Sequence, residues 1–191
     1  MHLKWREIVL GIILLFCFAA GVFYLWEQKE TAPGPVINNK PGYDVIVVGG
    51  EPEGIAAALS AARNGLKTLL IEDDYALGGL FTLGQLNFLD MNHGPKGELL
   101  TRGIFQEFYK AMGNAFDIEE AKKYFLNLVK KERNITLRLN AAFMEPLMEG
   151  SRIIGVKVKE KSEVREYLGL RVIDATADAE VAAAAGVPYT I

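Results

Sequence analysis

Two kinds of hydrophobic pattern divide the chain. Residues 8–26, IVLGIILLFCFAAGVFYLW, are uncharged and almost wholly apolar, whereas from residue 43 onward short apolar runs alternate with amphipathic segments. At about 1.5 Å per residue, the first stretch approaches the roughly 30 Å thickness of a bilayer core. Tyr24 and Trp26 end it, and aromatic rings favour the membrane interface. The pattern predicts one transmembrane helix over 8–26, in contact with the lipid bilayer, followed by an α/β domain.

Two alternatives to an uncleaved membrane anchor remain open. Residues 19–21, Ala-Ala-Gly, offer small side chains to a signal peptidase, although the apolar run continues past them. A helix buried in a protein core is the other alternative, but such a helix normally has a polar face. Lys4 and Arg6 precede the span, so residues 1–7 are expected to be cytoplasmic and the domain extracytoplasmic, in a single-pass protein of the cell membrane.

Composition narrows the functional classes. Residues 27–42 hold three prolines and two glycines and predict a linker, which leaves residues 43–191 for one domain with a real core. The formal net charge is -3 and no basic stripe is present, so nucleic-acid binding is not expected. The only cysteine, Cys17, excludes an internal disulfide and a Cys-x-x-Cys site, and two histidines are too few for a His-rich metal site. No metal is therefore expected.

Residues 44–72 show the pattern of strand, turn, helix and strand. The run DVIVV, residues 44–48, is short and β-branched, as in a parallel strand covered on both faces. Pro52 suits the first position of a helix, which is expected to end at Asn64-Gly65. Residues 67–71 predict a second buried strand.

The turn inside this unit resembles a dinucleotide-binding fingerprint, G-x-G-x-x-G. Gly49 permits the sharp turn, Gly54 lets the helix pack closely on the strand, and Glu72 ends the second strand, where a carboxylate can accept hydrogen bonds from ribose hydroxyls. Glu51 replaces the second glycine, and Glu53 follows in the first helical turn. Both charges are unfavourable near a phosphate, although solvent screening moderates this. A unit that folds but binds nothing therefore stays an alternative.

With these residues, the chain resembles the N-terminal part of FAD-dependent oxidoreductases with two dinucleotide-binding domains, in which the turn reads GGxPxGIAAAxAAAR. The resemblance covers roughly residues 43–190. It implies a Rossmann-like FAD/NAD(P)-binding domain of the α/β class, with a parallel sheet, a small antiparallel β-meander and FAD as cofactor. In that family the middle glycine is often replaced, so Glu51 is compatible with it.

The resemblance also implies the cofactor-binding residues. The glycine pair in YALGGLFTLG passes the flavin, backbone after the third strand touches the adenine, and the segment VIDATADAE returns to the cofactor, with Ala177 in place of a family glycine. The residues implied are Gly49, Gly50, Glu51, Pro52, Gly54, Glu72, Asp73, Gly78, Gly79, Phe143, Thr176, Ala177 and Asp178.

The remaining segments predict the rest of the domain. Helices are expected over 98–112 and 117–131, the second with Asp117 as N-cap. The run NITLRLNAAF is expected to hold the third sheet strand, and the runs RIIGVKVKE and REYLGLRVID predict two strands of the antiparallel unit.

The function expected is that of the FAD-binding portion of a membrane-anchored FAD-dependent oxidoreductase with an unknown small-molecule substrate. Family members are considerably longer, and the resemblance ends without their substrate domain, so no catalytic residue is nominated; His93 is the only histidine of the domain. Two alternatives stay open: a truncated or decayed flavoprotein that acts at most as a nucleotide-binding module, and an NAD-binding dehydrogenase domain. The glycine pair at 78–79 and the returning segment favour FAD over NAD.

Overall fold

The structure is a computed structural model that describes residues 42–190. The predicted transmembrane helix over 8–26, the N-terminal segment 1–7 and nearly all of the linker 27–42 lie outside these residues. Within the part that is described, no helix combines the length and the apolar character needed to cross a bilayer.

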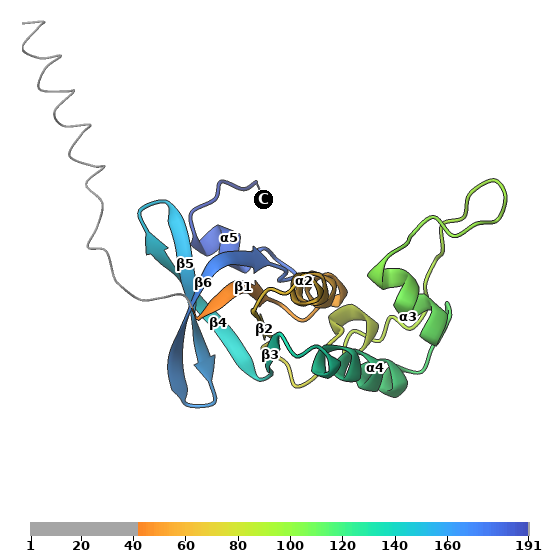
Figure 1. Cartoon of the computed structure of the whole chain (residues 1–191), viewed down its shortest axis with the longest axis horizontal. Coiled ribbons are helices and arrows are strands. Elements are labelled where there is room, and N and C mark those ends of the chain that lie inside the picture. Colours follow the sequence, from red (N-terminus) through yellow and green to blue (C-terminus); the bar gives the residue numbers. More distant parts are fainter. Residues whose placement is uncertain (1–41, 191) are drawn as a thin grey trace, which may run out of the picture. The chain divides into compact units, whose positions relative to one another are not determined.

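A six-stranded sheet with the order β3-β2-β1-β6-β5-β4 organises the domain (Figure 1). β1 (Tyr43–Val48) pairs in parallel with β2 (Thr68–Ile71), and β2 with β3 (Ile135–Arg138). On its other side, β1 pairs in parallel with the C-terminal half of β6 (Glu163–Asp174). The predicted parallel sheet is therefore confirmed, with β1 at its centre.

The described residues contain five helical segments, four of them between strands. The helix α2 (Pro52–Arg63) joins β1 to β2, as predicted, and the short 3-10 helix η1 (Gly79–Phe81) follows β2. The helices α3 (Ile104–Met112) and α4 (Ile118–Lys131) precede β3, and α5 (Glu180–Ala184) follows β6.

The sequence predicted the first residue of one helix correctly and that of another helix wrongly. The helix expected over 117–131 has Asp117 as N-cap, and its carboxylate accepts a hydrogen bond from the Glu120 N–H at 3.0 Å. The helix expected over 98–112 begins only at Ile104, because the chain turns at Gly103, which has φ 72°. Residues 98–103 are instead part of a loop.

The continuous apolar run of β1 is explained by two cores, one on each face of the sheet. Val45 and Val47 pack with α2, α3 and α4, whereas Ile46 and Val48 pack with residues of β5 and α5. Successive side chains of a strand point to opposite faces, so a strand covered on both sides is apolar at every position. In Figure 1, α2 and α4 lie to the right of β1, and β6 runs beside it in the sheet.

The predicted antiparallel β-meander is also present. It consists of β4 (Ala141–Glu149), β5 (Arg152–Glu160) and the N-terminal part of β6. The sequence did not indicate β4, which contains Pro146. β4 is an edge strand, and a proline is tolerated there because its missing N–H need not join the ladder.

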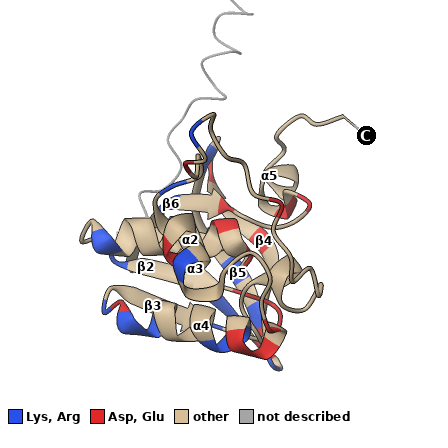
Figure 2. Cartoon of the chain, turned by 90° about the vertical axis from the view of Figure 1, so that its right-hand side faces the viewer, with Lys and Arg blue, Asp and Glu red and all other residues tan. Residues whose placement is uncertain are grey.

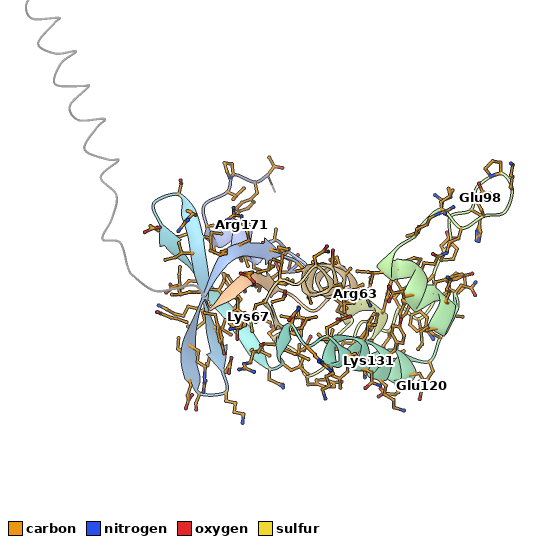
Figure 3. All side chains as sticks on the ribbon, viewed as in Figure 1. Arg63, Lys67, Glu98, Glu120, Lys131 and Arg171 are labelled. Atoms are coloured by element: carbon orange, nitrogen blue, oxygen red, sulfur yellow. The ribbon has the colours of Figure 1, made fainter. Side chains whose placement is uncertain are left out.

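Arg63, labelled in Figure 3 at the end of α2, forms ion pairs that link this helix to α3 and to the end of α4. Its Nη1 and Nη2 lie 2.7 and 2.9 Å from the two carboxylate oxygens of Glu107 in α3, and its Nε lies 2.9 Å from Glu132 Oε1 after α4. Such two-pronged arginine pairs are stronger than ordinary surface ion pairs. We expect Arg63→Ala to lower the free energy of unfolding by about 1–2 kcal/mol, measured by denaturant unfolding.

A matched control is available in Arg152→Ala, which breaks an exposed ion pair of 3.0 Å with Glu149 within the hairpin between β4 and β5. Exposed pairs of this kind contribute little to stability. Equal unfolding midpoints for the two variants would show that Arg63 is not a structural link.

Candidate functional site

Two positions at the junction of β1 and α2 accept only glycine. Gly49 has φ 104°, and a Cβ built there would lie 2.1 Å from the carbonyl oxygen of Ala175. A Cβ on Gly54 would lie 2.0 Å from the carbonyl oxygen of Gly49. The two glycines therefore bring α2 against β1 and the segment after β6, which is the arrangement that a dinucleotide-binding turn requires.

A second glycine segment lies behind this turn. The Gly78 N–H donates to the carbonyl oxygen of Gly50 at 2.8 Å, and a Cβ on Gly78 would lie 2.6 Å from the ring of Phe125. Thr82 is buried, and its hydroxyl donates to the carbonyl oxygen of Leu77 at 2.9 Å. Backbone and side-chain contacts that the sequence pattern alone did not reveal thus hold the segment in place.

Glu72 points from the end of β2 toward the glycine turn. Its Oε2 accepts a hydrogen bond from the Gly50 N–H, and its Oε1 accepts one from the Asp74 N–H at 2.9 Å. Burial raises the pKa of the Glu72 carboxyl, although these two N–H groups act in the opposite direction. The carboxylate is therefore fixed in orientation, with further lone pairs available to a ligand.

Asp174 organises the segment that follows β6. Its Oδ1 accepts from the N–H and the hydroxyl of Thr176 at 3.1 and 2.7 Å, and its Oδ2 accepts from the Ala182 N–H at 2.8 Å. The Thr176 hydroxyl in turn accepts from the Glu180 N–H at 2.8 Å. Sequence reasoning did not select Asp174; its signal was an aspartate two residues before a threonine, a spacing typical of a local Asx-type turn.

These elements surround a cavity of about 250 Å³. It opens where β1, β2 and β6 end, and ligands of open α/β sheets bind at this carboxyl edge. The residues lining it are Val48, Gly49, Glu51, Ile71, Glu72, Asp73, Asp74, Ala141, Phe143, Thr176, Ala177 and Glu180.

A second hollow of about 510 Å³ adjoins the first. The two share Glu51, Asp74 and Ala177 in their walls. The second hollow is completed by Glu53, Gly79, Leu80, Leu83 and Gly84.

Eight of the thirteen site residues expected from the sequence line these two hollows: Gly49, Glu51, Glu72, Asp73, Gly79, Phe143, Thr176 and Ala177. The other five lie elsewhere. Gly50, Gly54 and Gly78 are buried in the framework, and Pro52 faces a small apolar cavity between α2, α3 and α4. Asp178 is exposed and lines neither hollow.

The charge of the main cavity is entirely negative. Glu51, Glu72, Asp73, Asp74 and Glu180 line it, and none of the residues that line either hollow is a lysine or arginine. Figure 2 shows acidic residues at the start of α2 and at α5. An anionic pyrophosphate would therefore have to be held by backbone N–H groups and the positive end of the α2 dipole.

The residues at the β1–α2 end of the site fit the pyrophosphate and ribose of an adenine dinucleotide. Gly49 and Gly54, which exclude a Cβ, and the oriented Glu72 are the features that such a ligand uses for its pyrophosphate and ribose. Glu51, at the junction of the two hollows, is the feature that fits least.

The sequence of this chain is similar to a known protein family and to several known proteins. The family described as FAD dependent oxidoreductase matches residues 44–191. Digeranylgeranylglycerophospholipid reductase of Picrophilus torridus is 27% identical over 154 residues, which cover 70% of this chain and 38% of that protein. Thioredoxin reductase of Ureaplasma parvum is 36% identical over 62 residues, which cover 32% of this chain and 20% of that protein.

Solved structures support the fold. THI4 of Thermovibrio ammonificans aligns with a TM-score of 0.55 and 18% identity, over 96% of this chain and 70% of that one. The GidA-related protein of Thermus thermophilus aligns with a TM-score of 0.54 and 19% identity, over 70% of this chain and 52% of that one.

These matches agree with the glycine turn, the acid after β2 and the β-meander, and they confirm the resemblance found in the sequence. The chain spans well under half the length of the two curated relatives. It belongs to the FAD-dependent oxidoreductase family, and its cofactor is FAD.

Proposed function

We propose that this chain is the FAD-binding portion of a membrane-anchored oxidoreductase, in which FAD lies extended across the carboxyl edge of the parallel sheet. The observation that carries the proposal is the pair of adjoining hollows at this edge, which share one wall. One contains the oriented Glu72, and the other contains the backbone of Gly79. An elongated dinucleotide suits two connected hollows better than a compact ligand does.

Each part of the site has a role in this arrangement. Glu72 accepts hydrogen bonds from the adenosine ribose, Phe143 contributes an apolar surface for the adenine, and the N-terminus of α2 faces the pyrophosphate. Gly79 lies on the side of the flavin. The bound flavin supplies the redox chemistry, while the protein binds and orients it.

His93 is the only histidine among the described residues, and it lies away from the proposed cofactor site. His93 is exposed, and its Nδ1 lies 3.3 Å from the carbonyl oxygen of Met91 in the loop before α3. It lines neither hollow. We therefore assign no acid or base within the described residues.

The test is the visible absorbance of the full chain purified in detergent, followed by chromatography of the released cofactor. We expect flavin bands and FAD as the released molecule, and excess NAD should not displace it. A folded, colourless protein that ignores added FAD would favour the decayed flavoprotein, and displacement by NAD would favour the dehydrogenase alternative.

We also propose that residues 8–26 anchor the domain in the cell membrane, with residues 1–7 in the cytoplasm; their uncharged, apolar composition supports this. The chain should stay with membranes after alkaline carbonate washing, whereas a variant lacking residues 1–26 should be released. Recovery of a mature chain that begins near residue 21 would identify a cleaved signal peptide instead.

A further inference from the structure

Glu51 occupies the N-cap position of α2 but does not cap the helix. Its backbone is extended, with φ -61° and ψ 166°, and no side chain accepts a hydrogen bond at this helix start. An acidic N-cap residue normally accepts from an N–H of the first helical turn. Instead, Glu51 Oε2 accepts a hydrogen bond from the Leu80 N–H at 3.0 Å. The side chain thus connects the dinucleotide-binding turn to η1.

The Glu51 carboxylate lies directly against the backbone of Gly79. A Cβ built on Gly79 would lie 1.8 Å from Cδ and from both carboxylate oxygens of Glu51. Gly79 also has φ 36°, which L-residues with a side chain rarely adopt. The space beside Gly79 and Leu80 is therefore filled by the carboxylate.

This space is on the path between the two hollows. Glu51 is one of three residues that line both, together with Asp74 and Ala177. A ligand that reaches from Glu72 to Gly79 must pass Glu51. The phosphate groups of FAD are anionic, and the walls of both hollows contain no cation to offset the charge of Glu51.

We propose that Glu51 is a built-in competitor of the cofactor: its carboxylate holds the Leu80 N–H and must turn away before FAD extends across both hollows. The inference rests on the FAD site proposed above. It assigns to the residue that replaces the second glycine an autoinhibitory contact that weakens FAD binding. Once the carboxylate has moved, the Leu80 N–H is free to donate to the ligand.

The test compares FAD dissociation constants of the full chain and three variants, measured by quenching of flavin fluorescence. Glu51→Ala removes the carboxylate and keeps Cβ, and Glu51→Gly removes both. Glu53→Ala is the matched control: it removes an equal charge from the same helical turn, and Glu53 also lines the second hollow. Because a hydrogen bond to a charged group no longer has to be broken, we expect both Glu51 variants to bind FAD about tenfold more tightly. Glu53→Ala removes a screened charge from the same site without releasing the Leu80 N–H, so its gain should be smaller, less than about threefold.

Several results would overturn the inference and leave the FAD site intact. These are a wild-type chain that binds FAD with no gain in Glu51→Ala, a gain confined to Glu51→Gly, which would assign the effect to Cβ, and an equal gain in Glu53→Ala. Failure of every chain to bind FAD would instead reject the proposed site itself, and the competitor with it. Binding by Glu51→Ala but not by the wild type would support both.

A measurement without FAD tests the contact itself. In the ¹H–¹⁵N spectrum of the FAD-free chain, the Leu80 amide resonance should shift in Glu51→Ala and stay in place in Glu53→Ala, because only Glu51 accepts its hydrogen bond. An unchanged Leu80 resonance in Glu51→Ala would overturn the inference.

Discussion

Glu72→Lys is expected to weaken FAD binding by about 100-fold or more, since it removes a charged hydrogen-bond acceptor from the ribose and leaves the Gly50 N–H without its partner. Both carboxylate oxygens of Glu72 are already oriented by the N–H groups of Gly50 and Asp74. The side chain therefore faces the cavity without having to be ordered when the ligand binds. Titration calorimetry with FAD gives the dissociation constant.

Two companion variants separate charge from position. Glu72→Gln keeps an oxygen acceptor but loses the charge, so its loss of affinity should be smaller, about tenfold. Asp73→Asn removes the exposed charge beside it in the cavity wall but leaves the Glu72 acceptor in place, so it should weaken binding less than Glu72→Gln does. Affinity of Glu72→Lys within a factor of about three of the wild type, in a protein that melts normally, would remove Glu72 from the ribose role.

Gly54→Ala is expected to lower the free energy of unfolding by about 3 kcal/mol and to abolish FAD retention. Alanine is normally the better helix former, so propensity alone would raise stability. The Cβ, however, would lie 2.0 Å from the carbonyl oxygen of Gly49, where backbone rather than a flexible side chain must move. Thermal melts should show a fall of about 10 °C.

The control for Gly54 is Gly65→Ala, which lies at the other end of α2. Gly65 has φ 84°, and nothing lies within 4 Å of a Cβ built there. This variant should lose only about 1 kcal/mol from backbone strain and should retain FAD. A Gly54→Ala protein as stable as Gly65→Ala would show that the helix and strand are not held at closest approach.

The sequence predicted those elements of the fold that depend on residues close together in the chain. The apolar run of β1, the glycines of the turn and Pro52 at the start of α2 each act within a few residues, and together they located the first βαβ unit. Asp117 marked the start of α4 for the same reason. β4 was missed because its pairing partner, rather than its own composition, makes a strand containing Pro146 stable.

The site residues divide in the same way, into those that local spacing identifies and those that depend on contacts between distant parts of the chain. Gly49 and Glu72 were identified from spacing, because the turn and the strand end are adjacent in any such unit. The contact between Glu51 and Leu80 joins residues 29 apart in the chain, and no pattern near Glu51 points to it. The role of Asp174 likewise depends on the return of the chain at α5, where the Ala182 N–H meets its carboxylate.

The most direct test of this account is a calorimetric titration of FAD into the cofactor-stripped full chain. The wild-type chain should bind one FAD per chain saturably, and Glu72→Lys should bind it about 100-fold more weakly. A folded wild-type chain that gives no binding heat, or a Glu72→Lys chain that binds FAD as tightly as the wild type, would contradict the placement of FAD at the carboxyl edge of the sheet.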